Sequence, residues 1–141
     1  MVEAQNWNEV SEGQEFILTE EMDSQRLVVW AAASGDFYQI HYDDDFAKGN
    51  NLPDIIVHGA LKGMLVGRLL DEICGTEGQI KNWGVSYRGM DPARHDLTIH
   101  ATVTKKYEED GEKLLDLEVG VKQDDGSTET TPGTATVALP A

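Results

Sequence analysis

The residues best suited to chemistry in this chain are an aspartate and a histidine that lie five positions apart. Asp36 directly follows Gly35, and His41 lies between Ile40 and Tyr42. An imidazole changes its charge near neutral pH, and a carboxylate beside it can share a proton or a water molecule with it. The pair therefore predicts an acid–base site that moves protons at neutral pH.

A second motif, His58-Gly59, opens an apolar segment that reads as a helix from His58 to about Ile73. Apolar residues recur there every three or four positions, the spacing of one buried helical face: Leu61, Met64, Leu65, Leu69 and Ile73. The first N–H groups of a helix lack acceptors within the helix and lie at its positive end. We therefore expect the N–H of Gly59 to face a carbonyl oxygen or an anion, and we interpret His58 first as a residue of the helix start.

Three glycines recur at every fourth position of this segment: Gly59, Gly63 and Gly67. Each costs about 1 kcal/mol of helix propensity relative to alanine, so something must approach this stripe closely. Close packing of the helix on a curved sheet is the more common reason, and contact with a ligand is the alternative. Both can occur on one helix.

The elements around these motifs predict an α+β fold. A short strand is expected over residues 15–18, and a helix that carries residues 27–31 is expected after it, with residues 19–21 capping its start and Gly35 ending it. Residues 36–54 are polar and irregular, with a helical turn expected over residues 44–48.

Strands are predicted downstream of the long helix, over residues 79–88, 97–107, 114–122 and 130–139. Asp110-Gly111 and Asp125-Gly126 stand where hairpins need a positive φ. The natural interpretation is an antiparallel meander wrapped around a central helix, in one domain over residues 1–141.

The charge balance excludes some classes of partner. The chain has 26 acidic and 11 basic residues and a formal net charge of −15, which opposes extended contact with nucleic acid or with an anionic membrane. An anionic ligand would need a local basic patch, for which the candidates are Lys48, Lys62, Arg68, Lys81, Arg88 and Arg94.

The sequence also predicts the setting of the protein. Its apolar runs fall short of the ~20 residues that cross a bilayer, so we expect no transmembrane helix. Cys74 is the only cysteine and cannot form an internal disulfide, and the N-terminal residues lack the pattern of a signal peptide. Together these features predict a reducing, cytoplasmic location.

Metal and covalent chemistry are not expected. The histidines and carboxylates lack the spacing of a metal motif, and the run from Asp43 to Asp45 lacks the alternating ligands and the glycine of a calcium loop. Cys74 has no sequence elbow that would expose it as a nucleophile. His95 and His100 fall on or near a strand, and we expect them to be surface or cross-strand residues.

Taken together, Gly35-Asp36, Ile40-His41-Tyr42-Asp43 with Ala47, and His58-Gly59 resemble the signature of MaoC-like (R)-specific enoyl-CoA hydratases and 3-hydroxyacyl dehydratases of the hot-dog fold. The resemblance extends over the whole chain in the order of elements. It implies reversible hydration of a trans-2-enoyl-CoA to the (R)-3-hydroxyacyl-CoA, without a cofactor, by a water held between Asp36 and His41. The N–H of Gly59 would then bind the thioester carbonyl.

The chain also departs from the family pattern. Tyr38 and Gln39 stand where many members have asparagine and proline, and Met64 stands where the family often has a serine. Gly59, His58, Met64 and Tyr38 are the expected substrate-binding residues, and Met64 is expected to reshape the acyl pocket.

Other functions compete with this interpretation. The alternatives are a hot-dog acyl-CoA thioesterase, one subunit of a two-component enoyl-CoA hydratase for bulky acyl groups, and a non-catalytic acyl-binding subunit. The edges of a small curved sheet invite pairing, so we expect a homodimer or a heteromer with a second hot-dog subunit. The net charge favours coenzyme A over an acidic acyl carrier protein.

Overall fold

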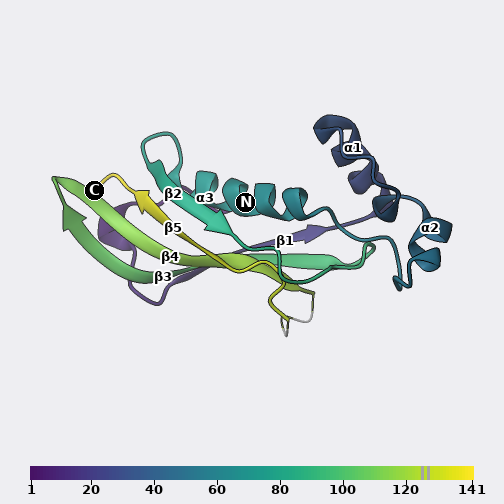
Figure 1. Cartoon of the computed structure of the whole chain (residues 1–141). Coiled ribbons are helices and arrows are strands. Elements are labelled where there is room, and N and C mark those ends of the chain that lie inside the picture. Colours follow the sequence, from purple (N-terminus) through teal and green to yellow (C-terminus); the bar gives the residue numbers. More distant parts are fainter. Residues whose placement is uncertain (125, 127) are drawn as a thin grey trace.

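The computed structural model describes residues 1–124, 126 and 128–141. In chain order its elements are η1 (Trp7–Glu9), β1 (Glu15–Glu21), α1 (Ser24–Ser34), η2 (Gln39–His41), α2 (Asp44–Gly49), α3 (Gly59–Cys74), β2 (Gln79–Val85), β3 (Asp96–Glu109), β4 (Glu112–Gln123) and β5 (Gly133–Ala138). One long helix lies over a curved sheet, and two shorter helices, α1 and α2, lie beyond one end of it (Figure 1). Among the described residues, every helix is too short or too polar to cross a membrane.

The sheet is antiparallel with the strand order β1-β3-β4-β5-β2. Only β3, β4 and β5 form the predicted meander, so the prediction of a simple meander was wrong for β2. The long helix carries the chain across the sheet before β2 forms, and β2 therefore pairs with β5 at the far edge. Asp110 and Gly111 join β3 to β4 with φ values of 52° and 79°, which confirms that hairpin. The hairpin expected at Asp125 lies outside the described residues.

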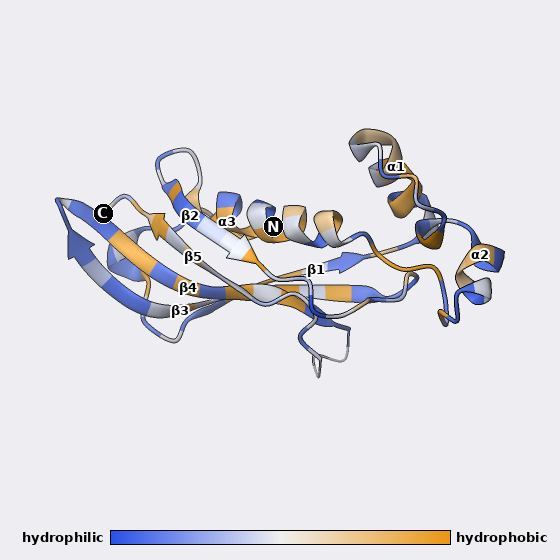
Figure 2. Cartoon of the chain, in the orientation of Figure 1, coloured by the Kyte–Doolittle hydropathy of each residue, from blue (hydrophilic) through white to orange (hydrophobic). Residues whose placement is uncertain are grey.

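Helix α3 is held on the sheet by its apolar face. Its buried side chains face the strands, all five of which α3 contacts, and Figure 2 shows hydrophobic residues recurring along α3 and β4. The core combines α3 with the inner face of the sheet: Leu61, Leu65, Leu69, Ile73, Leu97, Ile99, Leu115, Val121 and Val137 are among its members. The N-terminal end of α3 therefore has a fixed position over the sheet.

The glycine stripe of α3 receives two aromatic side chains. A Cβ at Gly67 would lie 3.2 Å from the Trp83 ring, and a Cβ at Gly59 would lie 3.3 Å from the Tyr87 ring. A Cβ at Gly63 would lie only 2.5 Å from the Tyr87 hydroxyl oxygen. These contacts come from β2 and from the residues just after it, so close packing accounts for the stripe.

The start of α1 differs from the prediction. Asp23 caps this helix by accepting a hydrogen bond from the N–H of Arg26, whereas residues 19–21 belong to β1. Gly35 ends α1 in the left-handed conformation, with a φ of 78°, as predicted. The strand continues to Glu21 because Glu20 and Glu21 still pair with Leu97 and Asp96 of β3.

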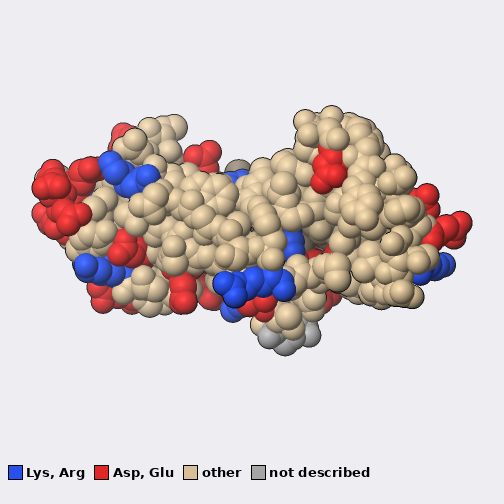
Figure 3. All heavy atoms as spheres, viewed as in Figure 1, with Lys and Arg blue, Asp and Glu red and all other residues tan. Residues whose placement is uncertain are grey.

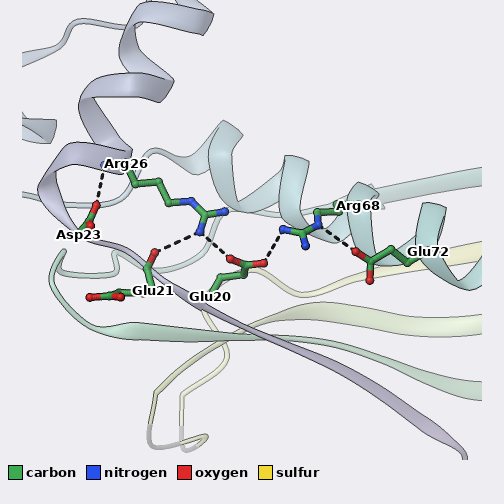
Figure 4. A network of polar contacts seen from close by, with 6 residues as sticks. All are labelled: Glu20, Glu21, Asp23, Arg26, Arg68 and Glu72. Carbon is green, nitrogen blue, oxygen red and sulfur yellow. Dashed lines mark hydrogen bonds and ion pairs between the residues drawn. The ribbon is translucent and has the colours of Figure 1, made fainter. Parts of the chain in front are cut away.

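Figure 4 shows a network of polar contacts in which Glu20 lies between α1 and α3. Its carboxylate accepts hydrogen bonds from Arg26 at 2.6 Å and from Arg68 at 2.6 Å. Burial raises the pKa of Glu20, but the two arginines outweigh this effect and leave the pKa below its ordinary value. Arg68 also binds Glu72 at 3.1 Å. The network ties α1 to the strand and to the long helix.

The pairing of β2 with β5 depends on a glycine. A Cβ at Gly133 would lie 2.1 Å from the carbonyl oxygen of Gly84. We predict that Gly133→Ala forces the two strands apart and lowers the free energy of unfolding by about 1–3 kcal/mol, measured by urea denaturation. Gly84→Ala on the facing strand is the control, because its Cβ would meet nothing within 4 Å. Equal stabilities for the two variants would contradict this account.

Candidate active site

Asp36 and His41 lie close together, as their spacing predicts. Asp36 comes directly after the left-handed turn at Gly35, and its Oδ1 accepts a hydrogen bond of 3.3 Å from the N–H of Tyr38. His41 ends the short helix η2. The Oδ2 of Asp36 is 3.7 Å from the Nε2 of His41. The Asp36 side chain is 47% exposed and that of His41 is 9% exposed, so the pair opens toward solvent from the carboxylate side.

A backbone carbonyl selects the tautomer of His41. The Nδ1 of His41 lies 2.7 Å from the carbonyl oxygen of Ile56. Because a carbonyl oxygen can only accept a hydrogen bond, Nδ1 must carry the proton. In the neutral ring, Nε2 then presents its lone pair toward Asp36. This is the arrangement that a general base requires.

His58 backs this pair without capping the helix. It occupies the N-cap position of α3, but its side chain makes no capping hydrogen bond. Its ring stacks on that of His41, with centroids 3.8 Å apart, and its Nε2 donates to the carbonyl of Asp36 at 3.2 Å. Its Nδ1 is buried without a hydrogen-bond partner among the described residues. Burial lowers the pKa of His58, and the nearby His41 lowers it further.

The first residue of α3 opens onto a cavity beside His41. Gly59 begins the helix, so its N–H has no acceptor within α3. A cavity of about 370 Å³ includes His41, Gly59 and Tyr87 among its walls. The structure therefore brings His41 and the N-terminal amide of α3 to the same space, with Asp36 3.7 Å from the His41 ring. This space can hold a small polar group that contacts both.

The other two expected binding residues lie at the margin of the site. Tyr38 is 51% exposed and stands edge-on to His41, with ring centroids 6.2 Å apart. Met64 is 38% exposed on α3 and is not among the described residues that line the cavity. Their roles in binding stay predictions.

Most of the expected basic patch does not form. Lys62 is buried and pairs with Asp91, and three other cations pair with carboxylates: Arg68, Lys81 and Arg94. Arg88 is exposed, lines the cavity and has no carboxylate partner among the described residues. Reasoning from the sequence missed the burial of Lys62, although its place between Leu61 and Leu65 on the apolar face of α3 was an available signal.

The remaining histidines differ from one another. His95 is exposed and faces Asp124, as a surface residue should. His100 is buried on β3, and its Nε2 lies 2.7 Å from Glu129, which bridges to β4, so it takes the cross-strand position of the two that were expected. Glu129 reaches His100 across Gly120, where a Cβ would collide with its carboxylate.

The geometry of the site and of Cys74 disfavours metal binding and covalent catalysis. Asp36, His41 and His58 offer ligand atoms within 4.8 Å of one another. The two rings, however, are stacked with 18° between their planes, so their lone pairs run side by side and do not converge on one ion. Burial raises the pKa of Cys74 to about 11, which keeps it a thiol and not a nucleophile.

Comparisons with known proteins agree with this fold. An (R)-hydratase from A. caviae involved in PHA biosynthesis has a TM-score of 0.83 and 25% identity, over 94% of this chain and 98% of that one. R-hydratase PhaJ1 from Pseudomonas aeruginosa has a TM-score of 0.86 and 21% identity, over 99% and 88%. A chain of the ChsH1-ChsH2 complex from Mycobacterium tuberculosis has a TM-score of 0.76 and 24% identity, over 92% of this chain and 98% of that one.

No curated protein sequence is significantly similar to this chain. A family model described as the MaoC like domain matches residues 4–126, which is most of the sequence. The fold, the structural neighbours and this match together show that the chain belongs to the MaoC-like dehydratase family and has the hot-dog fold.

Proposed function

We propose that this protein reversibly hydrates a trans-2-enoyl-CoA to the (R)-3-hydroxyacyl-CoA, with Asp36 and His41 as its catalytic residues. The observation that carries the proposal is the 3.7 Å separation of the Asp36 Oδ2 and the His41 Nε2 at the edge of a cavity. This separation is too long for a direct hydrogen bond. An oxygen about 2.8 Å from both atoms fits between them, which is the place for a reacting water.

The tautomer of His41 determines which ring nitrogen can accept a proton. The ring accepts a proton from the water at Nε2 while the water oxygen bonds to C3 of the enoyl group, and Asp36 orients the water through a second hydrogen bond. Hydration consumes one water and delivers one hydrogen to C2. The Asp36–His41 pair therefore takes up one proton and returns one, and no redox partner is needed.

The helix amide provides the electrostatic part of the reaction. Attack at C3 moves negative charge onto the thioester oxygen, and a donor that is already in place stabilises that charge without reorganisation. Gly59 presents its N–H at the positive end of α3, and it has no side chain to obstruct the approach. His58 stays neutral behind the pair, because its lowered pKa disfavours a second positive charge there.

The charge distribution of the chain favours coenzyme A as the carrier of the acyl group. A chain with a net charge of −15 repels an acidic carrier protein over a large surface. A coenzyme phosphate needs only a local cation, and Arg88 offers one at the cavity. The nearest competing function is thioester hydrolysis, which would release free thiol and leave no hydroxyacyl product.

We predict that Asp36→Asn and His41→Gln each lower kcat by about 10² to 10⁴, because each removes one contact to the reacting water. The measurement is loss of the conjugated thioester absorbance with crotonyl-CoA, a medium-chain enoyl-CoA and a ring-bearing one. Chiral analysis of the product and a free-thiol assay accompany it.

Asp45→Asn and His95→Gln serve as matched controls, because both residues are exposed and lie outside the pair. They should retain wild-type rates. Wild-type rates in the Asp36 and His41 variants would favour a non-catalytic acyl-binding role instead. Release of thiol by the wild-type protein would replace hydration with hydrolysis.

The burial of His58 leads us to predict that the free energy of unfolding depends on pH. Because its pKa is lowered in the folded chain, first by burial and then by His41, the unfolded chain binds this proton more readily. Unfolding then takes up a proton below the ordinary histidine pKa of about 6.5, so the free energy of unfolding falls as pH drops below that value. His58→Gln should make this fall shallower, measured by urea denaturation at several pH values between neutral and mildly acidic. His95→Gln should keep the wild-type slope, and equal slopes for both variants would refute the assignment.

We further propose that the protein works as an assembly, either a homodimer or a heteromer with a second hot-dog subunit. Acidic side chains gather at the two ends of the molecule in Figure 3, over the β3–β4 hairpin and α2, and the middle of that face is mostly tan apart from a group of Lys and Arg side chains along its lower part. Large apolar side chains near the site and on α1 remain exposed: Val28, Val29, Phe37, Trp83, Tyr87 and Met90. A second subunit would cover them and close the cavity beside His41.

We predict a mass of at least twice the 15.5 kDa of one chain at micromolar concentration, measured by analytical ultracentrifugation. Trp83→Glu should shift the protein toward monomer, because Trp83 is 40% exposed on the edge strand β2. Ile17→Glu is the control, since Ile17 is 48% exposed on β1 at the opposite edge. A monomer with full hydratase activity would rule out the assembly, whereas a monomer that gains activity only with a second hot-dog chain would identify the heteromer.

A further inference from the structure

A charged pair is buried beside the candidate site. The side chains of Lys62 and Asp91 are 2% and 0% exposed, and the Lys62 Nζ lies 2.7 Å from the Asp91 Oδ2. The same ammonium donates to the carbonyl of Gly89 at 3.0 Å. Buried ion pairs often add little stability compared with apolar residues of the same size. The place of this pair in the fold therefore invites another explanation.

On one side, the pair is tied to the sheet through Thr130. The Thr130 hydroxyl donates to Asp91 Oδ2 at 2.6 Å, and the Thr130 carbonyl accepts from the N–H groups of Arg88 and Gly89 at 2.9 and 3.1 Å. The Thr130 N–H in turn donates to the carbonyl of Val121 in β4 at 3.0 Å. Residues 88–91 are thus held between α3 and the sheet.

On the other side, the same segment leads to His41. The Asp91 carbonyl accepts from the N–H of Val57 at 2.9 Å, and Pro92 bridges to Ile56. Ile56 is the residue whose carbonyl accepts from the Nδ1 of His41 at 2.7 Å. A continuous series of short polar contacts and one peptide bond therefore runs from the Lys62 ammonium to the imidazole.

We propose that Lys62 and Asp91 are positioning residues that set the tautomer and orientation of His41. The ion pair fixes the segment that carries Asp91, this segment fixes the neighbouring strand-like residues 56–57, and the Ile56 carbonyl then keeps the proton of His41 on Nδ1. Lys62 is also in the first turn of α3, so one side chain aligns the base with the helix amide of Gly59. The proposal deepens the proposed function and rests on it for its effect on rate.

The central test is Lys62→Met, which keeps the length of the side chain and removes its charge. In the wild-type protein at pH 8, long-range ¹H–¹⁵N correlation spectra should show His41 protonated on Nδ1, with the signal assigned by its loss in His41→Gln. In Lys62→Met we expect a mixture of both tautomers, and a kcat about tenfold lower with KM changed less than twofold. Thr130→Val should move both quantities in the same direction by a smaller factor.

A control with comparable loss of stability separates positioning from folding. Ile73→Ala removes a buried side chain at the far end of α3 and should lower the Tm while leaving the tautomer of His41 and kcat unchanged. Lys81→Met breaks the exposed pair with Glu112 and should change neither quantity.

An Nδ1-protonated His41 and a wild-type kcat in Lys62→Met would overturn the proposal, whatever the change in Tm. If Lys62→Met does not fold, Thr130→Val decides, and a wild-type tautomer and kcat in that variant would overturn it equally. Absence of hydratase activity in the wild-type protein would instead defeat the proposed function. The tautomer of His41 would still test the positioning role.

Discussion

The candidate site depends on the close approach of α3 to the sheet. The helix lies over all five strands, and its glycine stripe lets Trp83 and Tyr87 pack directly on its backbone. A helix held this closely has little freedom to slide or turn, because each shift would empty part of the core or press an aromatic ring into the backbone. The position of its first residue, Gly59, is therefore set by packing along its whole length.

The irregular segment before α3 is positioned differently, by hydrogen bonds. Between residues 36 and 54 only Ala47 is a buried apolar side chain, whereas residues 55–57 are buried, and the two parts are joined by contacts such as the one between the His41 Nδ1 and the Ile56 carbonyl. The stacked ring of His58 fills the space behind His41. Packing thus fixes the position of the helix amide, whereas hydrogen bonds and the stacked rings fix that of Asp36 and His41. The candidate site lies between these two regions.

Much of this could be predicted from the sequence, because local patterns carry local structure. The spacing of apolar residues in α3, the end of α1 at Gly35 and the hairpin at Asp110-Gly111 follow from side-chain and backbone preferences. The proximity of Asp36 to His41 follows from their short separation in the chain.

Features that depend on long-range pairing could not be predicted in the same way. The position of β2 beside β5 depends on where the chain leaves α3 in space. Glu20 was interpreted as a charge at a helix start, but it pairs with arginines 6 and 48 positions away. Lys62 was a candidate for a basic patch, and its pairing with Asp91 could not be foreseen because Asp91 is 29 residues away in the sequence.

The stacking of His58 on His41 limits how much charge this corner of the molecule can hold. Once one imidazole is positive, the second ring lies 3.8 Å away in a buried position, where the nearby carboxylate, Asp36, is shared by both rings. The stacked arrangement thus disfavours two positive charges at once. In the proposed hydration, this corner would take up one proton and return one in each turnover, which fits a site that holds one added proton at a time.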